Sequence, residues 1–196
     1  MTEPNYEYAT NAAYAELLHY NGHFPQIDIF ELIHESGNIK LKTYSQAAYY
    51  YNCSHNEFTY NIAQSEFGFT ILDLKNNRHI IYYNDYKDSK TIRFTLAHEL
   101  GHIKLGHDED NKRTNREANC FARNILCPVQ LIDGFNLSTA DDYVECFDIS
   151  RPMAEVSLAH FKSDSHYISR RNYEVINDKI YCYMTGYTLR ELYNYY

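Results

Sequence analysis

The sequence predicts an α+β fold in which helices pack against a small sheet. Two runs rich in β-branched and aromatic residues, at 67–74 and 79–83, flank a polar turn and are typical of a β-hairpin. A mostly apolar segment at about 89–106 follows, and we expect it to form a largely buried helix. Further helical segments occur on both sides of this region. Together these observations predict a small mixed or antiparallel sheet packed on the 89–106 helix.

The first 66 residues are predicted to add two helices and a strand. Residues 6–20 read as a helix rich in alanine and leucine, ended by the pair Asn21-Gly22. Spaced apolar residues after Pro25 predict a second helix that stops at Ser36-Gly37. Residues 39–44 alternate apolar and polar side chains, as a strand does, whereas the segment 45–66 has no clear period beyond a possible short helix at 46–52.

The length of 196 residues suggests one domain with an appendage or two small domains. We expect residues 1–135 to form the domain that holds the site described below, and residues 136–196 to pack on it. The sequence has no run of eighteen apolar residues, so it predicts no transmembrane helix. The N-terminus also lacks the pattern of a secretory signal. The sequence therefore predicts a cytoplasmic protein that does not enter a membrane.

Charge and cysteine content exclude some further classes. The net charge of −8 does not favour strong nonspecific attraction to nucleic acid. The chain has five cysteines and no Cys-x-x-Cys pair, so we expect free thiols rather than disulfides or a cysteine zinc site.

The segment 94–102 contains the motif His-Glu-x-x-His. His98 and His102 lie four residues apart, so on a helix their rings project from one face and can bind one Zn²⁺ ion. Glu99 then lies beside the metal, where it can act as general base toward a water molecule. The apolar residues around the motif indicate a buried helix, and buried polar groups need partners. Asn119 and Asp85 are candidates to orient the two rings.

A catalytic zinc site usually has three protein ligands, so a third one must lie elsewhere. Glu117 is the main candidate, because it lies on the predicted next helix, at 115–126, with Thr114 as its N-cap. The alternative role for Glu117 is that of a helix N-terminal acid. His107 is a second candidate ligand. Its alternative role is that of a cation at the end of the helix, where the helix dipole favours positive charge. The acidic run at 108–110 is a rival that we expect to be solvated.

The C-terminal third is predicted to contain two helices, at 141–147 and 152–161, joined by a short turn. This pair could be a DNA-binding helix-turn-helix, but both helices carry acidic residues that phosphates would repel. We therefore expect a packing hairpin of helices. Two further runs, at 168–175 and 179–183, predict a β-hairpin around Asn177-Asp178, and residues 188–196 predict a short terminal helix.

Several motifs of the chain resemble those of the ImmA/IrrE metallopeptidases. The segment 93–102 is similar to that family's FTLAHELGH-type helix, and the segment 117–128 is similar to its EAN-x-FA-x-x-LL-x-P helix. Residues 146–156 are similar to the family's turn and following helix. Two positions depart from the pattern: Asn115 replaces an acidic residue, and Cys127 replaces a methionine before the closing proline.

The resemblance implies a zincin-like minimal metallopeptidase with a gluzincin-type ligand set. His98, His102 and Glu117 would be the metal ligands, and Glu99 would be the general base. The metal would be Zn²⁺, with Mn²⁺ as a possible substitute. The substrate would be a partner protein, typically a helix-turn-helix transcriptional repressor of a phage, mobile element or stress regulon. The alternative is a catalytically silent zincin-fold regulator that binds a repressor or host factor without cleaving it.

Overall fold

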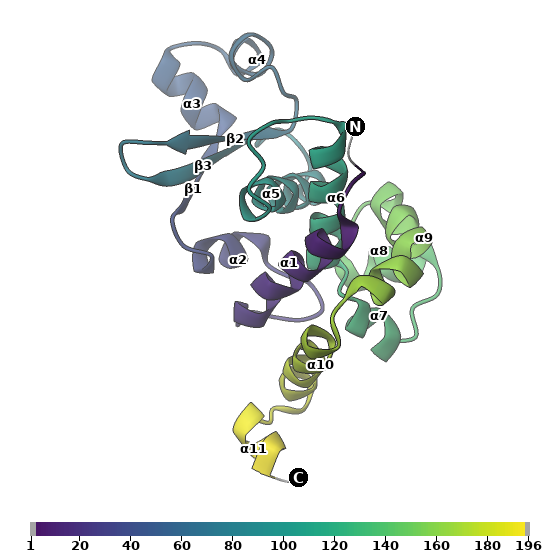
Figure 1. Cartoon of the computed structure of the whole chain (residues 1–196). Coiled ribbons are helices and arrows are strands. Elements are labelled where there is room, and N and C mark those ends of the chain that lie inside the picture. Colours follow the sequence, from purple (N-terminus) through teal and green to yellow (C-terminus); the bar gives the residue numbers. More distant parts are fainter. Residues whose placement is uncertain (1–2, 195–196) are drawn as a thin grey trace.

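The structure is a computed structural model, in which residues 3–194 are described (Figure 1). The strands are β1 (Ile39–Thr43), β2 (Gly68–Asp73) and β3 (Arg78–Tyr83). The helices before the motif are α1 (Tyr6–His19), α2 (Ile29–Glu35), α3 (Tyr44–Tyr51), α4 (His55–Glu57) and the π-helix η1 (Phe58–Ala63). Those that follow are α5 (Ser89–Lys104), α6 (Lys112–Leu126), α7 (Val129–Gly134), α8 (Ala140–Phe147), α9 (Arg151–Tyr167), α10 (Arg170–Thr185) and α11 (Leu189–Asn194). The predicted α+β class is confirmed.

The three strands form a mixed sheet in the order β1-β3-β2. β2 and β3 are the predicted antiparallel hairpin, and β1 pairs with β3 in parallel. Side chains of a strand alternate between its two faces. Ile80 and Tyr82 accordingly join a cluster with residues of α3 and η1, whereas Ile81 joins the main core with residues of α5. The sheet therefore lies between two layers of helix, and β2 is left at one edge.

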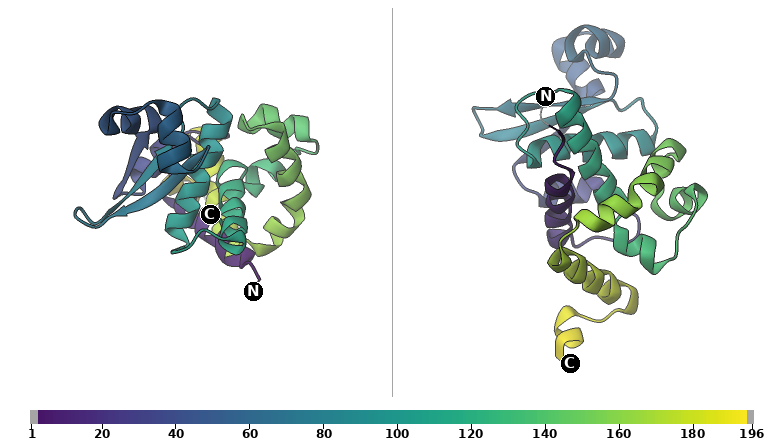
Figure 2. Two further views of the ribbon diagram at one scale, coloured as in Figure 1. Left: turned by 90° about the horizontal axis from the view of Figure 1, so that it is seen from above. Right: turned by 45° about the vertical axis from the view of Figure 1, so that its right-hand side comes forward.

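Helices α5 and α6 lie at the centre of the molecule and pack closely against each other (Figures 1 and 2). Their approach depends on Gly101, because a Cβ atom there would lie 3.1 Å from the Phe121 ring and 3.2 Å from the backbone of Ala118. Asn111, rather than the predicted Thr114, caps α6. Thr114 occupies the third helical position and completes a capping box with Asn111.

Two buried contacts attach the later helices to this centre. Arg123 of α6 donates two hydrogen bonds, of 2.6 and 2.8 Å, to the carboxylate of Asp164 on α9. Arg93 of α5 donates to the backbone oxygens of Phe147 and Ile27, at 2.9 and 3.1 Å. The main hydrophobic core contains residues of α1, α2, β3 and all the helices from α5 to α10. The division of the chain at residue 135 stays a prediction.

The C-terminal third departs from the prediction after α9. The segment predicted as a hairpin at 168–183 is instead the single helix α10, capped at its start by Ser169. Its buried residues Ile176 and Ile180 are four apart and so share one helix face, whereas in a hairpin they would belong to opposite strands. The Lys179 ammonium donates to the carbonyl oxygens of Leu17 and Leu18, at 3.2 and 2.8 Å, and so ties α10 to the end of α1.

The cysteines are free thiols, as expected. Within residues 3–194, none of the helices is long and apolar enough to cross a membrane.

Candidate functional site

The two motif histidines converge on one face of α5, as predicted. The Nε2 atoms of His98 and His102 are 3.0 Å apart. The Nδ1 atom of His98 lies 2.8 Å from the side-chain oxygen of Asn119 on α6, so Asn119 is the orienting partner that the sequence suggested. Burial lowers the pKa of His98. Burial and the neighbouring rings of His98 and His107 lower the pKa of His102 to about 4, so both imidazoles are neutral near pH 7.

A third polar group faces this pair from α6. The side-chain oxygen of Asn115 lies 3.3 Å from the Nε2 atom of His102. The amide nitrogen of Asn115 donates to the carboxylate of Asp110, and this bond fixes which end of the amide faces the histidine. Asn115 and Asn119 are four residues apart, so both project from the helix face that looks toward α5.

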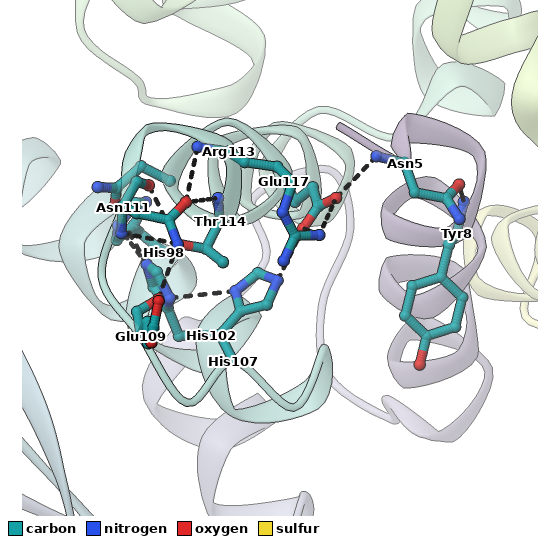
Figure 3. Close-up of polar contacts among 11 residues, drawn as sticks. Asn5, Tyr8, His98, His102, His107, Glu109, Asn111, Arg113, Thr114 and Glu117 are labelled. Carbon is teal, nitrogen blue, oxygen red and sulfur yellow. Dashed lines mark hydrogen bonds and ion pairs between the residues drawn. The ribbon is translucent and has the colours of Figure 1, made fainter. Parts of the chain in front are cut away.

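Glu117 does not join the histidine pair in the structure. Its carboxylate accepts hydrogen bonds from Arg113 at 3.2 Å and from the backbone nitrogen of Asn5 at 2.7 Å, and it lies 2.9 Å from the Nε2 atom of His107 (Figure 3). Each helical residue turns the side chain by about 100°, so Glu117 points roughly 200° away from Asn115. The predicted grouping of Glu117 with the two histidines is therefore not found.

His107 also differs from its expected role. We expected a candidate ligand or a cation at the end of the helix, but the side chain is only 6% exposed and lies between His102 and Glu117. Its Nδ1 atom is 3.1 Å from the Nδ1 atom of His102. Asp85, the other suggested orienting residue, is occupied elsewhere and accepts a hydrogen bond from the backbone of Ser45.

Glu99 is buried beside the histidines, on the side of α5 that faces the sheet. The hydroxyl of Thr70 on β2 donates to its Oε2 atom at 2.8 Å. Burial raises the pKa of the Glu99 carboxyl to about 7, although the Thr70 hydrogen bond acts in the opposite direction. A carboxyl with a pKa near neutrality can both take up and release a proton under physiological conditions.

Two surface hollows meet at Glu99. One, of about 720 Å³, runs along β2 and the loop after α5 and is also lined by His102. The other, of about 530 Å³, lies between α5 and the start of α9 and is also lined by His98. Glu99 and Asp110 line both hollows. The two hollows are therefore adjacent over the motif, and we refer to them together as the cleft.

The residues at this cleft meet part of the requirement for a metal site. Two neutral imidazoles on a single tetrahedral zinc ion place their nitrogens about 3.3 Å apart, close to the 3.0 Å observed for His98 and His102. The oxygen of Asn115 adds a third donor atom at similar spacing. Within residues 3–194, however, no group of three His, Cys, Asp or Glu side chains is placed to bind one metal ion. The donor set thus fits a metal through two imidazoles and an amide oxygen.

Sequence reasoning missed Thr70, Asn115 and the position of His107. The spacing of Asn115 and Asn119 was a usable signal, because it places two amides on one face and excludes Glu117 from that face. Thr70 carried no such signal, since its contact with Glu99 depends on how the hairpin packs on α5.

One comparison with known proteins, with protein-family models, gave a match. A family model described as Peptidase_M78, IrrE N-terminal-like domain, matches residues 61–158, which is half of the chain. The matched region contains the hairpin, the motif helix α5, helix α6 and the first part of α9. The search of curated proteins found no matching relative. By the extent of the family match, which confirms the resemblance seen in the sequence, this chain belongs to the Peptidase_M78 family of proteins with an IrrE N-terminal-like domain.

Proposed function

We propose that this protein is a metal-dependent endopeptidase that cleaves a partner protein. The observation that carries the proposal is the position of Glu99. It lies where the two hollows meet, and each hollow is also lined by one of the two histidines whose Nε2 atoms face each other at 3.0 Å. A base, a pair of ligand atoms and room for an extended chain therefore coincide at one point.

His98 and His102 would hold the metal, with the oxygen of Asn115 as the nearest further donor. Zn²⁺ is the ion we propose, and Mn²⁺ is a possible substitute because it also accepts imidazole and amide oxygen. When bound, the ion would supply Lewis-acid polarisation of the scissile carbonyl and of the attacking water.

Glu99 would take the proton from the attacking water and later deliver it to the leaving amine. The hydrogen bond from Thr70 holds the Oε2 atom of Glu99 and leaves its other oxygen free for the proton. Burial of Glu99 keeps competing water away from this carboxylate.

The sheet edge would hold the substrate. Among residues 3–194, β2 pairs only with β3, so its other side offers backbone groups to an extended peptide that adds as a further strand. The hollow between α5 and α9 is lined by four large apolar side chains, Phe67, Phe94, Met153 and Val156. We propose that it receives an apolar side chain of the substrate beside the bond that is cut.

The substrate that we propose is a helix-turn-helix transcriptional repressor in the cytoplasm of a bacterium, or of the host of a phage or mobile element. The resemblance to ImmA/IrrE metallopeptidases is the support for this choice. The net charge of −8 argues against direct binding of the chain to nucleic acid.

The test is incubation of the purified protein, loaded with zinc, with the repressor encoded beside it. Wild type should produce two defined fragments, and Glu99→Gln should leave the substrate intact while retaining the metal. Glu174→Gln, on the exposed surface of α10, is the matched control and should cleave as wild type does. Equal cleavage by wild type and Glu99→Gln would show that the protease is a contaminant or that Glu99 is not the base.

One observation favours a second candidate, a zincin-fold regulator that binds a repressor without cutting it. Glu117 lies away from the histidine pair, so three strong protein ligands are not assembled. A silent regulator would bind the repressor with the same affinity whether position 99 is Glu or Gln, and neither protein would produce fragments.

A further inference from the structure

A chain of three contacts runs from Glu117 through His107 to the two motif histidines. The carboxylate Oε2 atom of Glu117 is 2.9 Å from the Nε2 atom of His107. The Nδ1 atom of His107 is 3.1 Å from the Nδ1 atom of His102, and the Nε2 atom of His102 is 3.0 Å from that of His98. Figure 3 shows the ring of His107 between His102 and the Glu117 carboxylate. The two side chains at the Glu117 end of this chain, His107 and Glu117, are each only 6% exposed.

The carboxylate of Glu117, at the end of this chain of contacts, sets the direction of the hydrogen bonds. An ionised carboxylate only accepts, so the Nε2 atom of His107 must carry the hydrogen. In a neutral ring the Nδ1 atom of His107 is then an acceptor, and the hydrogen between the two rings belongs to the Nδ1 atom of His102. The Nε2 atom of His102 is left with a lone pair that points at His98 and also lies 3.3 Å from the side-chain oxygen of Asn115, which is itself an acceptor.

His98 is held in the same tautomer by a different partner, Asn119. The Asn119 oxygen accepts, so the hydrogen lies on the Nδ1 atom of His98 and the lone pair on its Nε2 atom. Two lone pairs then face each other at 3.0 Å. Such an arrangement repels in the absence of a cation and binds one well in its presence.

We propose that Glu117 is a positioning residue and not a metal ligand. Acting through His107, it fixes His102 in the tautomer that presents Nε2 to the metal, as Asn119 does for His98. This inference rests on the proposed metal-binding role of the motif histidines. Arg113 and the backbone of Asn5 hold the Glu117 carboxylate at the far end, so the relay is anchored on α6 and on the segment before α1.

The first test reads the tautomers directly in the zinc-loaded protein. Imidazole ¹⁵N NMR near neutral pH distinguishes a ring nitrogen that carries hydrogen from one with a lone pair. We expect hydrogen on the Nδ1 atom of His102 and on the Nε2 atom of His107, and a lone pair on the Nδ1 atom of His107. Hydrogen on the Nδ1 atom of His107 would overturn the proposal, because His107 would then not accept the hydrogen bond from His102.

The second test measures zinc affinity in two variants of the middle residue. His107→Leu interrupts the relay and should weaken zinc binding about 10- to 100-fold, as loss of an outer partner typically does. His107→Gln offers an oxygen to His102 and an N–H group to Glu117, so it should restore affinity to within a few fold of wild type. His160→Leu, at an exposed position of α9, is the matched control and should bind as wild type does.

The third test separates a positioning role from ligation and does not depend on peptide cleavage. Cobalt-substituted wild type and Glu117→Gln should show visible bands at the same positions and of similar intensity, because the donor atoms are unchanged. Altered band positions or intensities with Glu117→Gln, together with unchanged affinity in His107→Leu, would make Glu117 a ligand and contradict the proposal. Failure of the cleavage experiment would leave these spectra unaffected, so the two proposals can fail separately.

Discussion

At the scale of single residues, the site depends on which side chains share a helix face. His98 and His102 share one on α5, and Asn115 and Asn119 share another on α6, so four side chains meet between the two helices. Glu99 is one residue from His98 and therefore faces the sheet, where Thr70 holds it. The proposed base and the proposed metal-binding atoms thus come from adjacent positions but from different sides of one helix.

Loss of the Thr70 hydroxyl should slow the reaction without unfolding the protein. Thr70→Val keeps the branched shape of the side chain but removes the hydrogen bond to Glu99, so the base loses its orienting contact. We expect kcat/KM to fall about tenfold, at the low end of the losses in activity that typically follow removal of a residue that orients a functional side chain. Thr70→Ser retains the hydroxyl and should keep most of the activity; equal losses in the two variants would refute the orienting role.

Tyr44 should contribute to an alkaline loss of stability. Its buried hydroxyl donates to the backbone oxygen of Ser65 at 3.1 Å, and burial raises its pKa from 10.0 to about 12. The folded state therefore binds this proton more tightly, so its stabilising effect is complete below pH 10 and is lost as the pH rises through 12. Tyr44→Phe should cost about 1 kcal/mol at pH 7 for the lost hydrogen bond.

The pH dependence of urea unfolding checks this assignment. The free energy of unfolding of Tyr44→Phe should fall less steeply above pH 10 than that of wild type. Identical slopes in the two proteins would show that other groups cause the alkaline loss.

At the scale of elements, the close contact of α5 and α6 brings the two sets of side chains together. Gly101 permits it, since any Cβ at this position would press on the Phe121 ring and the backbone of Ala118. Gly101→Val should therefore lower the free energy of unfolding by about 2–3 kcal/mol through overpacking. Gly134→Val is the control, because nothing lies within 4 Å of a Cβ there. Equal stability of both variants in urea titrations would contradict this account of the contact.

The sequence predicted elements best where the local signal and the packing agree. The hairpin of β2 and β3, the motif helix and helix α6 were all recognised, because polar turns and apolar faces indicate the same elements, although the cap of α6 was misplaced. Helix α10 was predicted as a hairpin since its β-branched and aromatic residues favour strands. Its packing on α1 and α7 outweighs that preference. Glu117 was misplaced for a related reason: the sequence places it on the helix after the motif, but the face that it occupies depends on how α6 packs on α5.

At the scale of the whole molecule, helix α9 forms one wall of the cleft and is attached to the core by the Arg123–Asp164 pair. Both side chains are buried, so removal of one partner leaves an uncompensated charge. Asp164→Asn should destabilise the protein by about 3 kcal/mol in urea titrations. The double variant Arg123→Met with Asp164→Leu should recover most of that loss. A double variant that is less stable than Asp164→Asn would indicate that the pair contributes more than charge compensation.

The central claim is that His98 and His102 bind the metal beside Glu99, and zinc titration calorimetry of the purified chain tests it most directly. Wild type should bind about one zinc ion per chain, as the single histidine pair implies. Glu99→Gln should also bind about one, because Glu99 is not a ligand. His98→Ala should lose this binding. Equal zinc binding by wild type and His98→Ala, or none by wild type, would contradict the account.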